Sequence, residues 1–364
     1  MTLYAWGANS YGQLGLGHKS EEEIEPKKVK LSDTDLKAEN IVSIAGGAVH
    51  TLILDNNGYV YCCGYNSKGQ LGLSDDTLKF SQIEILKGFK IVQISCGWDF
   101  SAAISDCGKQ FVWGNNGNTQ LGLSKSITCT GIPSRLQVSQ KLATGFKHVS
   151  CGLRHSAMIT KDGGLLVAGT GAKGQLGLGD NFDDNNYLSI SKVPEIEDVI
   201  SCASGQHHTV MLKEDGTVMS WGENKYGQLG ISNNVSNSFV PMEVFRDESL
   251  EKVYAGWTHS AALTKNGEVY TWGRNSYGQL GTSREELHKP EKVPDLTEIA
   301  QLSLGSEHNL AVTKEGKLLA WGWNEHGSCG TGDKKDVMKP TQVLSNHKVK
   351  LAFACTGSSF AVVE

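Results

Sequence analysis

The stretch WGRNSYGQLG, from Trp272 to Gly281, decides the fold, because six further versions of it occur along the chain. They begin at Trp6 (WGANSYGQLG), Cys63 (CGYNSKGQLG), Trp113 (WGNNGNTQLG), Ala168 (AGTGAKGQLG), Trp221 (WGENKYGQLG) and Trp321 (WGWNEHGSCG). The glutamine position of the motif recurs at intervals of 57, 50, 55, 53, 51 and 49 residues, at Gln13, Gln70, Gln120, Gln175, Gln228, Gln279 and Ser328. A period near 50 residues is typical of propeller blades or of solenoid repeats.

A second block precedes the motif, and before Cys63 it is IVSIAGGAVHTLILDNNGYVYCCG, from Ile41 to Gly64. It contains three apolar runs of about five residues, rich in β-branched and aromatic types, as β-strands are. Asn57-Gly58 separates the second run from the third and predicts a hairpin turn with positive φ at both central residues. The same turn is predicted at Cys107-Gly108, Asp162-Gly163, Asp215-Gly216, Asn266-Gly267 and Glu315-Gly316.

After each motif a further short run follows, and each repeat therefore supplies about four antiparallel strands, as a propeller blade does. The chain ends in LAFACTGSSFAVVE, the first two strands of a block, and we expect Thr2–Trp6 to supply the third. The prediction is an all-β, seven-bladed β-propeller of four-stranded antiparallel blades, one domain spanning residues 1–364, closed by pairing of the N- and C-terminal strands. Prolines, which suit edge strands because they cannot donate to a ladder, lie in the last runs: Pro133, Pro194, Pro241, Pro290 and Pro340.

The composition disfavours several classes of protein. Lys plus Arg number 34 and Asp plus Glu 39, so the formal net charge is −5, whereas binding to nucleic acid depends on neutralising phosphates. No apolar run approaches the roughly 18 residues of a membrane span, and MTLYAWGANS has no signal-peptide pattern. Nine cysteines without a C-x-x-C pair indicate reduced thiols. We expect a cytoplasmic protein, with the nucleus as a second location, and no cofactor or metal.

Two kinds of recurring side chain are interpreted as structural, because repetition is what packing between blades predicts and a single binding site does not need it. One is the indole that ends a strand in five repeats, at Trp6, Trp113, Trp221, Trp272 and Trp321. The other is the histidine of a G-x-x-H pattern, which we expect to tie a bend to the adjoining backbone, at His50, His155, His208, His259 and His308. Phe100 and Phe360 are predicted to hold the histidine position in two repeats.

No arrangement of serine, cysteine or carboxylate residues argues for catalysis, so we expect a protein that is not an enzyme. Residues 169–174 match G-x-G-x-x-G, but they lie in the repeat register, and a dinucleotide site needs a helix after the strand. Function is therefore sought where the repeats differ, at the residue after WG and at the two residues inside G-x-x-H, which should surround the central opening on one face. Trp98, Trp257 and Trp323 lie at such positions, and loop tryptophans among charges have the composition of an interface hot spot. The predicted pairs inside G-x-x-H are Ala48-Val49, Trp98-Asp99, Leu153-Arg154, Gln206-His207, Trp257-Thr258, Ser306-Glu307 and Ser358-Ser359.

The blocks G-x-x-H-[ST] and WG-x-N-x-x-GQLG together resemble the regulator of chromosome condensation repeat family over essentially the whole chain. Strings beginning at Ala5 (AWGANSYGQLGLGH), Ser95 (SCGWDF), Gly305 (GSEHNLAV) and Trp321 (WGWNEHG) are similar to its DelGEF branch, the secretion-regulating guanine-nucleotide-exchange factors. The fungal alpha-tubulin-suppressor branch, which works with Elongator, resembles the chain in GWD and WGW-x-EHG.

The resemblance to these two branches implies a non-enzymatic propeller, a monomer or one half of a heterodimer. The implied partner is a small CSL-type zinc or iron finger protein of diphthamide synthesis and of Elongator-dependent tRNA wobble-uridine modification. The predicted contact set is Trp98, Asp99, Trp257, Glu307, His308, Trp323, Glu325 and His326.

The family name implies an alternative function, guanine-nucleotide exchange on a small GTPase. Exchange needs a protein surface that displaces the magnesium and phosphate contacts of the switch loops. The founding member of the family uses a protruding wedge and carries a basic tail. Here the repeat intervals leave little room for a wedge and the chain starts at its first blade, so we expect that Ran is not the substrate.

Overall fold

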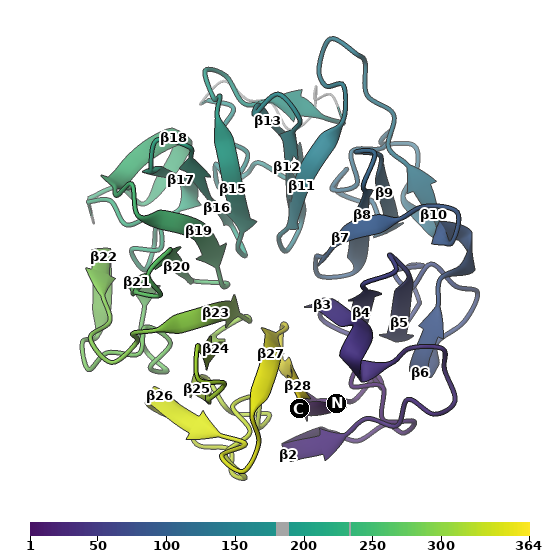
Figure 1. Ribbon diagram of the computed structural model, residues 1–364. Helices are drawn as coiled ribbons and strands as arrows, with labels where there is room; N and C mark the ends of the chain where they lie inside the picture. The colour runs from purple at the N-terminus through teal and green to yellow at the C-terminus, as the bar shows by residue number, and fades with distance from the viewer. Residues whose placement is uncertain (180–188, 233) are drawn as a thin grey trace.

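The computed structural model describes residues 1–179, 189–232 and 234–364. Its strands form seven four-stranded antiparallel sheets arranged as a ring around a central channel (Figure 1). The predicted seven-bladed β-propeller is thereby confirmed. Blade 1 contains both termini and has the strand order β2-β1-β28-β27, and blades 2 to 7 follow in chain order from β3–β6 to β23–β26.

Each blade has an inner strand beside the channel, two middle strands and an outer strand. The inner strands are β27 (Val349–Ala354), β3 (Ile41–Gly46), β7 (Ile91–Cys96), β11 (Phe146–Cys151), β15 (Val199–Ser204), β19 (Leu250–Ala255) and β23 (Ile299–Leu304). The second strands are β28 (Ser358–Val363), β4 (His50–Asp55), β8 (Phe100–Ser105), β12 (His155–Thr160), β16 (His208–Lys213), β20 (His259–Thr264) and β24 (His308–Thr313). The third strands are β1 (Thr2–Ala8), β5 (Val60–Gly64), β9 (Gln110–Asn115), β13 (Leu165–Gly169), β17 (Thr217–Glu223), β21 (Val269–Arg274) and β25 (Leu318–Gly322). The outer strands are β2 (Glu22–Lys28), β6 (Thr77–Gln82), β10 (Cys129–Arg135), β14 (Ser191–Lys192), β18 (Asn237–Arg246), β22 (Glu286–Lys292) and β26 (Val337–Val343).

The two ends of the chain close the ring. β1 pairs antiparallel with β28, in a register that places Thr2 opposite Val363 and Gly7 opposite Ser358. Figure 1 shows the N- and C-termini side by side in this blade. The predicted closure is confirmed, because the N-terminal strand completes the blade to which the two C-terminal strands belong. Two short 3-10 helices, η1 (Ala38–Asn40) and η2 (Glu84–Leu86), lie in the connections on either side of blade 2.

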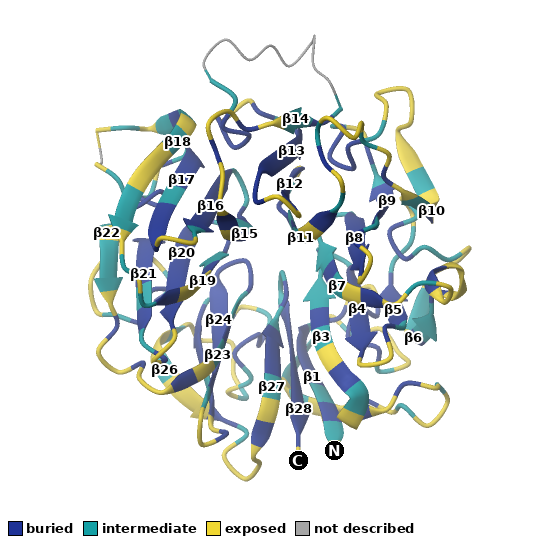
Figure 2. Cartoon of the chain, turned by 45° about the horizontal axis from the view of Figure 1, so that its top comes forward, coloured by how far each residue is buried: buried dark blue, intermediate teal, exposed yellow. Residues whose placement is uncertain are grey.

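The apolar core lies between the blades. The two middle strands of each blade are almost wholly buried, whereas the outer strands, the loops and single positions of the inner strands carry the exposed residues (Figure 2). Prolines 133, 241, 290 and 340 lie in outer strands as predicted, whereas Pro194 lies two residues after the end of the short β14. Each apolar cluster combines residues of two neighbouring blades, as Val210, Ala262 and Trp272 do between blades 5 and 6.

The repeated indole is buried between blades, as the sequence predicts. Trp272 is fully buried, and its Nε1 donates a 3.0 Å hydrogen bond to the main-chain oxygen of Gln228 in the preceding repeat. Gly230, two residues farther on, has a φ of +70°, and a Cβ there would lie 3.0 Å from the Trp272 ring. Glycine is required at this position both by its backbone conformation and by the close approach of the indole.

The hairpin turns differ from the prediction. Gly58 has positive φ, but Asn57 does not, and the Gly58 amide donates to the Asp55 oxygen at 3.0 Å. The Asp55 amide in turn donates to the Tyr59 oxygen at 3.0 Å. The connection is thus a type I turn followed by a glycine bulge, in which only the glycine needs the left-handed conformation. The expected positive φ at both central residues was wrong.

The register of blade 1 also corrects the sequence prediction. The Cys355 amide donates to the Ser358 oxygen, as the Gly47 amide does to the His50 oxygen. Ser358 therefore holds the histidine position of blade 1, and Phe360 does not. The two loop residues that precede it are Thr356 and Gly357, so the predicted pair Ser358-Ser359 was displaced by two residues. The error arose because blade 1 has Cys355 where other repeats have glycine.

Candidate protein-docking face

Two sets of loops meet at one end of the channel. The residue after WG donates its amide to the oxygen of the second residue inside G-x-x-H, as Arg274 does to Thr258 at 3.0 Å and Trp323 does to Glu307 at 2.9 Å. The variable positions of the repeats therefore surround one mouth of the channel, as the sequence predicts. We call this surface the mouth face. It is formed by the residue pairs 48–49, 98–99, 153–154, 206–207, 257–258, 306–307 and 356–357 and by residues 8, 65, 115, 170, 223, 274 and 323.

Trp98 and Trp257 close the centre of the mouth face. They come from blades 3 and 6, on opposite sides of the ring, and their ring centroids lie 5.6 Å apart. Trp98 is 40% exposed and Trp257 is half-buried. Beneath them is a cavity of about 110 Å³, whose lining includes Gly97, Gly152 and Cys355. The structure thus brings together two predicted contact residues that are 159 positions apart in the numbering.

Asp99 is held beside this pair. Asn115 Nδ2 donates to Asp99 Oδ2 at 2.7 Å. Partial burial raises the pKa of Asp99, while the hydrogen bond from Asn115 and the nearby charges of Lys68 and Arg154 act in the opposite direction. Asp99 is therefore a partly desolvated acid whose orientation is fixed before any partner arrives.

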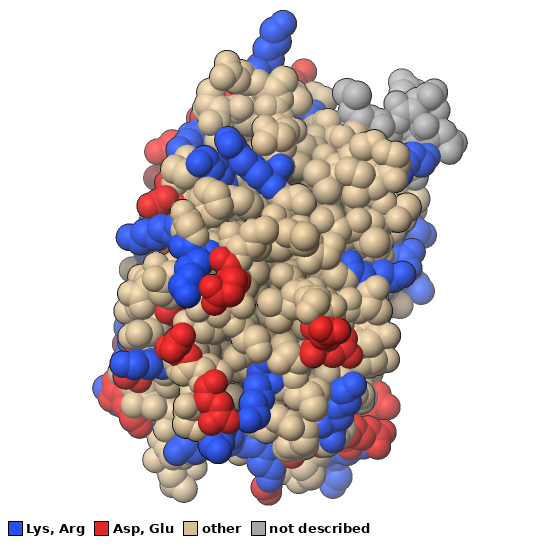
Figure 3. Space-filling model, turned by 90° about the vertical axis from the view of Figure 1, so that its right-hand side faces the viewer, with Lys and Arg blue, Asp and Glu red and all other residues tan. Residues whose placement is uncertain are grey.

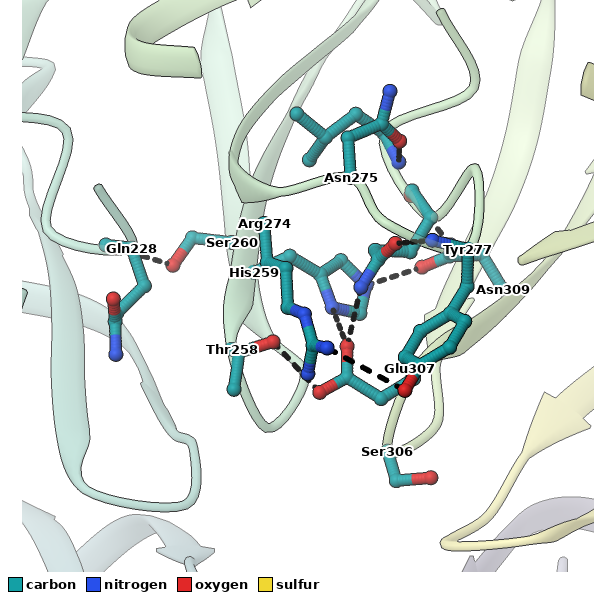
Figure 4. A network of polar contacts seen from close by, with 12 residues as sticks. Gln228, Thr258, His259, Ser260, Arg274, Asn275, Tyr277, Ser306, Glu307 and Asn309 are labelled. Atoms are coloured by element: carbon teal, nitrogen blue, oxygen red, sulfur yellow. Dashed lines mark hydrogen bonds and ion pairs between the residues drawn. The ribbon is translucent and has the colours of Figure 1, made fainter. Parts of the chain in front are cut away.

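Glu307 lies inside the junction of blades 6 and 7 rather than on the surface (Figure 4). Only 6% of the residue is exposed. Thr258 Oγ1 donates to its Oε1 at 2.6 Å, Gln279 Nε2 donates to its Oε2 at 2.7 Å, and His259 Nδ1 lies 3.7 Å from Oε2. The carboxylate is thus satisfied internally, and the structure corrects the prediction that Glu307 contacts a partner.

His308 is also excluded from direct contact. It is fully buried, and its Nε2 lies 2.9 Å from Ser359 Oγ of blade 1. Ser359 Oγ donates to the Ser328 oxygen, so the hydroxyl accepts the Nε2 proton of the histidine. Burial lowers the pKa of His308 to about 3. The repeated histidine therefore joins one blade to a side chain of the next, instead of tying its own bend to the adjoining backbone as expected.

Trp323, Glu325 and His326 remain on the surface, near the junction of blades 7 and 1. The Trp323 and His326 rings meet edge to face with centroids 5.1 Å apart. His326 Nδ1 lies 3.9 Å from Glu22 Oε2 on β2, and Lys334 Nζ lies 2.8 Å from Glu22 Oε1. Glu325 is exposed. The deviant motif thus forms an aromatic and charged cluster at the rim of the mouth face.

An aromatic and cationic cluster was missed by the sequence analysis. The Arg274 guanidinium lies between the rings of Tyr226 and Tyr277, 4.9 Å and 4.7 Å from their centroids. Blades 1 and 2 contribute a further pair, Tyr11 and Tyr65, at 5.0 Å. A signal was present, because Tyr11, Tyr226 and Tyr277 all precede the GQLG glycine.

Charges elsewhere are mixed. On the side of the ring that carries β6 and β10, basic and acidic side chains are interspersed among uncharged surface (Figure 3). Within the described residues, no group of three or more histidine, cysteine or acidic side chains could hold a metal ion. No helix of the described segments is long and apolar enough to cross a membrane. The mouth face therefore has the chemistry of a protein contact: aromatic rings, an arginine and oriented polar groups.

Comparison with known proteins identifies the family. The model of the RCC1-like domain matches residues 2–363. The chain belongs to the RCC1-like domain family. Its RCC1-like fold is shared by Prp20p of Saccharomyces cerevisiae, with a TM-score of 0.89 and 23% identity over 100% of this chain and 91% of that one.

Two curated RCC1-like relatives are similar in sequence. The secretion-regulating guanine nucleotide exchange factor of Mus musculus is 36% identical over 306 residues, which cover 79% of this chain and 63% of the mouse protein. The ultraviolet-B receptor UVR8 of Arabidopsis thaliana is 34% identical over 311 residues, 83% of this chain and 68% of the receptor. The matched region is thus less than two thirds of the mouse protein's length.

Proposed function

We propose that the mouth face docks a protein partner, and that this partner is a small GTPase whose nucleotide exchange the propeller promotes. The observation that carries the proposal is the meeting of Trp98 and Trp257 at the channel mouth, partly exposed, although neither holds the indole position that packing requires. Aromatic anchors of this kind dominate the binding energy of protein interfaces. The choice of a GTPase is supported by the mouse relative, which is named as a guanine nucleotide exchange factor.

The fixed orientation of individual side chains on the face supports this role. An exchange factor must stabilise a GTPase conformation in which the switch loops release the nucleotide, and side chains that are already oriented lose little conformational entropy on binding. Asn115 fixes Asp99, and Tyr226 and Tyr277 hold the Arg274 guanidinium. These groups are oriented before binding.

Release of a fluorescent GDP analogue from a panel of small GTPases, Ran included, tests the proposal. Catalytic amounts of the propeller should accelerate release from one member, and Trp98→Ala should abolish most of the acceleration. Val92→Ala is the matched control, because Val92 is 50% exposed at the opposite end of β7. If no GTPase in a broad panel responds to the wild-type chain, exchange activity is excluded as the function.

A second occupant of the same face is the small CSL-type zinc or iron finger protein. It is favoured by the strings around Trp98 and Trp323, which both lie on the mouth face and which resemble the branches whose implied partner is such a protein. Under this hypothesis the chain acts in diphthamide synthesis and Elongator-dependent tRNA modification, without enzymatic activity of its own. This function is favoured over exchange if the wild-type chain co-purifies with the finger protein, Trp323→Ala does not, and the wild-type chain leaves GDP release at its basal rate.

We also propose that the chain is a monomer until it meets its partner and that it works in a reducing compartment, the cytosol or the nucleus. All nine cysteines are free. Fractionation of tagged protein from cells tests the location, and light scattering of the purified chain tests its oligomeric state.

A further inference from the structure

Every junction has a hydrogen bond from the side chain after the histidine position to the main-chain oxygen of the glutamine position in the preceding repeat. Three further hydrogen bonds near the mouth join some pairs of neighbouring blades but not others. At the junction of blades 5 and 6, His208 Nε2 lies 2.9 Å from Ser260 Oγ, and Trp272 Nε1 lies 3.0 Å from the Gln228 oxygen. The third bond joins the loops themselves, where the Gln206 amide donates to the Trp257 oxygen at 3.3 Å. These three bonds fix the orientation of one blade on the next, because hydrogen bonds are directional.

The three bonds occur together or not at all. The junctions of blades 2 and 3, 4 and 5, 5 and 6, 6 and 7, and 7 and 1 have all three. Among the described residues, the junctions of blades 1 and 2 and of blades 3 and 4 have none. There the histidine position holds Ser358 or Phe100, and the indole position holds Cys63 or Ala168.

The two exceptional junctions differ from each other along the inner strands. Between blades 3 and 4, Gln93 exchanges two hydrogen bonds with the backbone of Val149, at 3.0 and 2.9 Å, and Ser95 Oγ accepts from the Cys151 amide at 3.0 Å. Between blades 1 and 2, within the described part of the chain, no hydrogen bond joins β27 to β3. The junction of blades 3 and 4 is therefore bonded beside the channel, and that of blades 1 and 2 is not.

Contacts between blades 1 and 2 are mainly apolar. The shared cluster contains Leu3, Phe353 and Phe360 of blade 1 and Cys63 and Phe80 of blade 2. Few polar contacts between these two blades occur in the part of the chain that the structure describes. The main-chain oxygen of Gln13 accepts hydrogen bonds from Thr51 Oγ1 at 2.8 Å and from Cys63 Sγ at 3.3 Å. The Gly17 amide donates to the Leu78 oxygen. Lys79 forms an exposed ion pair with Asp33. Apolar contact is non-directional, so it permits sliding and separation that directional bonds resist.

We propose that the ring opens at the junction of blades 1 and 2 and that the junction of blades 3 and 4 is its hinge. Blades 2 and 3, residues 41–135, then move as one body, which the three bonds between them hold together. Trp98 belongs to this body and Trp257 to the other five blades, so their contact bridges the mouth and holds the ring closed. The proposal concerns the isolated chain and stands whichever partner binds the mouth face.

Two adjacent cysteines provide an internally controlled probe. Cys62 and Cys63 are both fully buried on β5, and burial raises the pKa of both thiols. Cys63 belongs to the apolar cluster shared with blade 1, whereas Cys62 belongs to the cluster shared with blade 3, which includes Trp113. Opening between blades 1 and 2 exposes Cys63 alone, and global unfolding exposes both.

The experiment is alkylation of the native full chain with iodoacetamide, with the label located by fragmentation of the peptide that carries both cysteines. The proposal expects Cys63 to react about tenfold faster than Cys62, as a local opening of lower free energy than global unfolding requires. Equal rates, or faster labelling of Cys62, would overturn it.

The role of the tryptophan pair is tested by the same ratio of labelling rates. Trp98→Ala should raise the ratio of Cys63 to Cys62 labelling several-fold, because it removes the contact that bridges the moving body and the rest of the ring. Trp323→Ala is the matched control, since Trp323 lies on the same face but within the five-blade body, and it should leave the ratio unchanged. An unchanged ratio in Trp98→Ala would contradict the hinge at blades 3 and 4. A general loss of stability cannot imitate the expected result, because it accelerates the labelling of Cys62 through global unfolding and so lowers the ratio or leaves it unchanged.

Discussion

Thr258 donates a 2.6 Å hydrogen bond to the buried carboxylate of Glu307 across the junction of blades 6 and 7. Gln279 binds the second carboxylate oxygen at 2.7 Å. Glu307→Ala should therefore lower the free energy of unfolding by about 2–3 kcal/mol, because it leaves two buried donors without an acceptor. Urea denaturation followed by circular dichroism measures the change. Glu325→Ala, at an exposed position of the same blade, should stay within about 0.5 kcal/mol of wild type, and an equal loss in both variants would contradict the structural role of Glu307.

Trp272→Ala should be among the more destabilising substitutions in the chain. It removes a fully buried indole from the cluster between blades 5 and 6 and leaves the Gln228 oxygen without its Nε1 donor. The expected loss is about 3–5 kcal/mol of unfolding free energy. Measurement by the same denaturation curve suffices, and a loss below about 1 kcal/mol would mean that the blades do not rely on this contact.

Trp323→Ala should separate binding from stability. The side chain is only half-buried and contacts His326 at the rim of the mouth face. We expect a nearly unchanged melting temperature and a partner affinity weakened by about 2 kcal/mol or more. Titration calorimetry with the partner identified by exchange or co-purification gives the affinity. Unchanged affinity would remove Trp323 from the contact set.

The free energy of unfolding should decrease as the pH is lowered, over a range set by the pKa values of the buried histidines. Burial lowers the pKa of His50, His155, His208 and His308 from 6.5 to about 3. Between these values the unfolded chain binds protons that the folded chain does not. The contribution of these neutral histidines to the free energy of unfolding is therefore fully present above pH 6.5. It is lost as the pH falls towards 3, by about 1.4 kcal/mol per pH unit for each histidine.

His50→Phe tests this linkage with a residue that the chain itself uses at the equivalent Phe100. The slope of unfolding free energy against pH, measured between pH 4 and 6 by urea denaturation, should decrease by about 1.4 kcal/mol per pH unit. His18→Phe is the control, because that side chain is 56% exposed. An unaltered slope in His50→Phe would show that burial does not lower the pKa of this imidazole in the folded chain.

The position of the candidate face could be predicted from the sequence, but which of its residues expose their side chains could not. The repeat register places Trp98, Trp257 and Trp323 at variable loop positions, and these positions do surround the mouth. Glu307 also lies at a variable loop position, yet its carboxylate is buried and accepts hydrogen bonds from Thr258 and Gln279 of the neighbouring blade. Whether a loop side chain faces solvent depends on donors about 30 to 50 residues away, and a pattern within one repeat does not contain that information.

By itself, the sequence determined the architecture. Seven copies of the WG and GQLG motif, each needing a neighbour to cover its apolar strands, require a closed ring, and the incomplete block at the C-terminus requires a strand from the N-terminus. The tertiary structure alone decided how the blades are joined. Among the described residues, five junctions combine a histidine, an indole and a loop amide, whereas the two that have Ser358 with Cys63 or Phe100 with Ala168 lack these bonds. The reason is that each such bond pairs groups from successive repeats, so its presence depends on the register and spacing of two blades together.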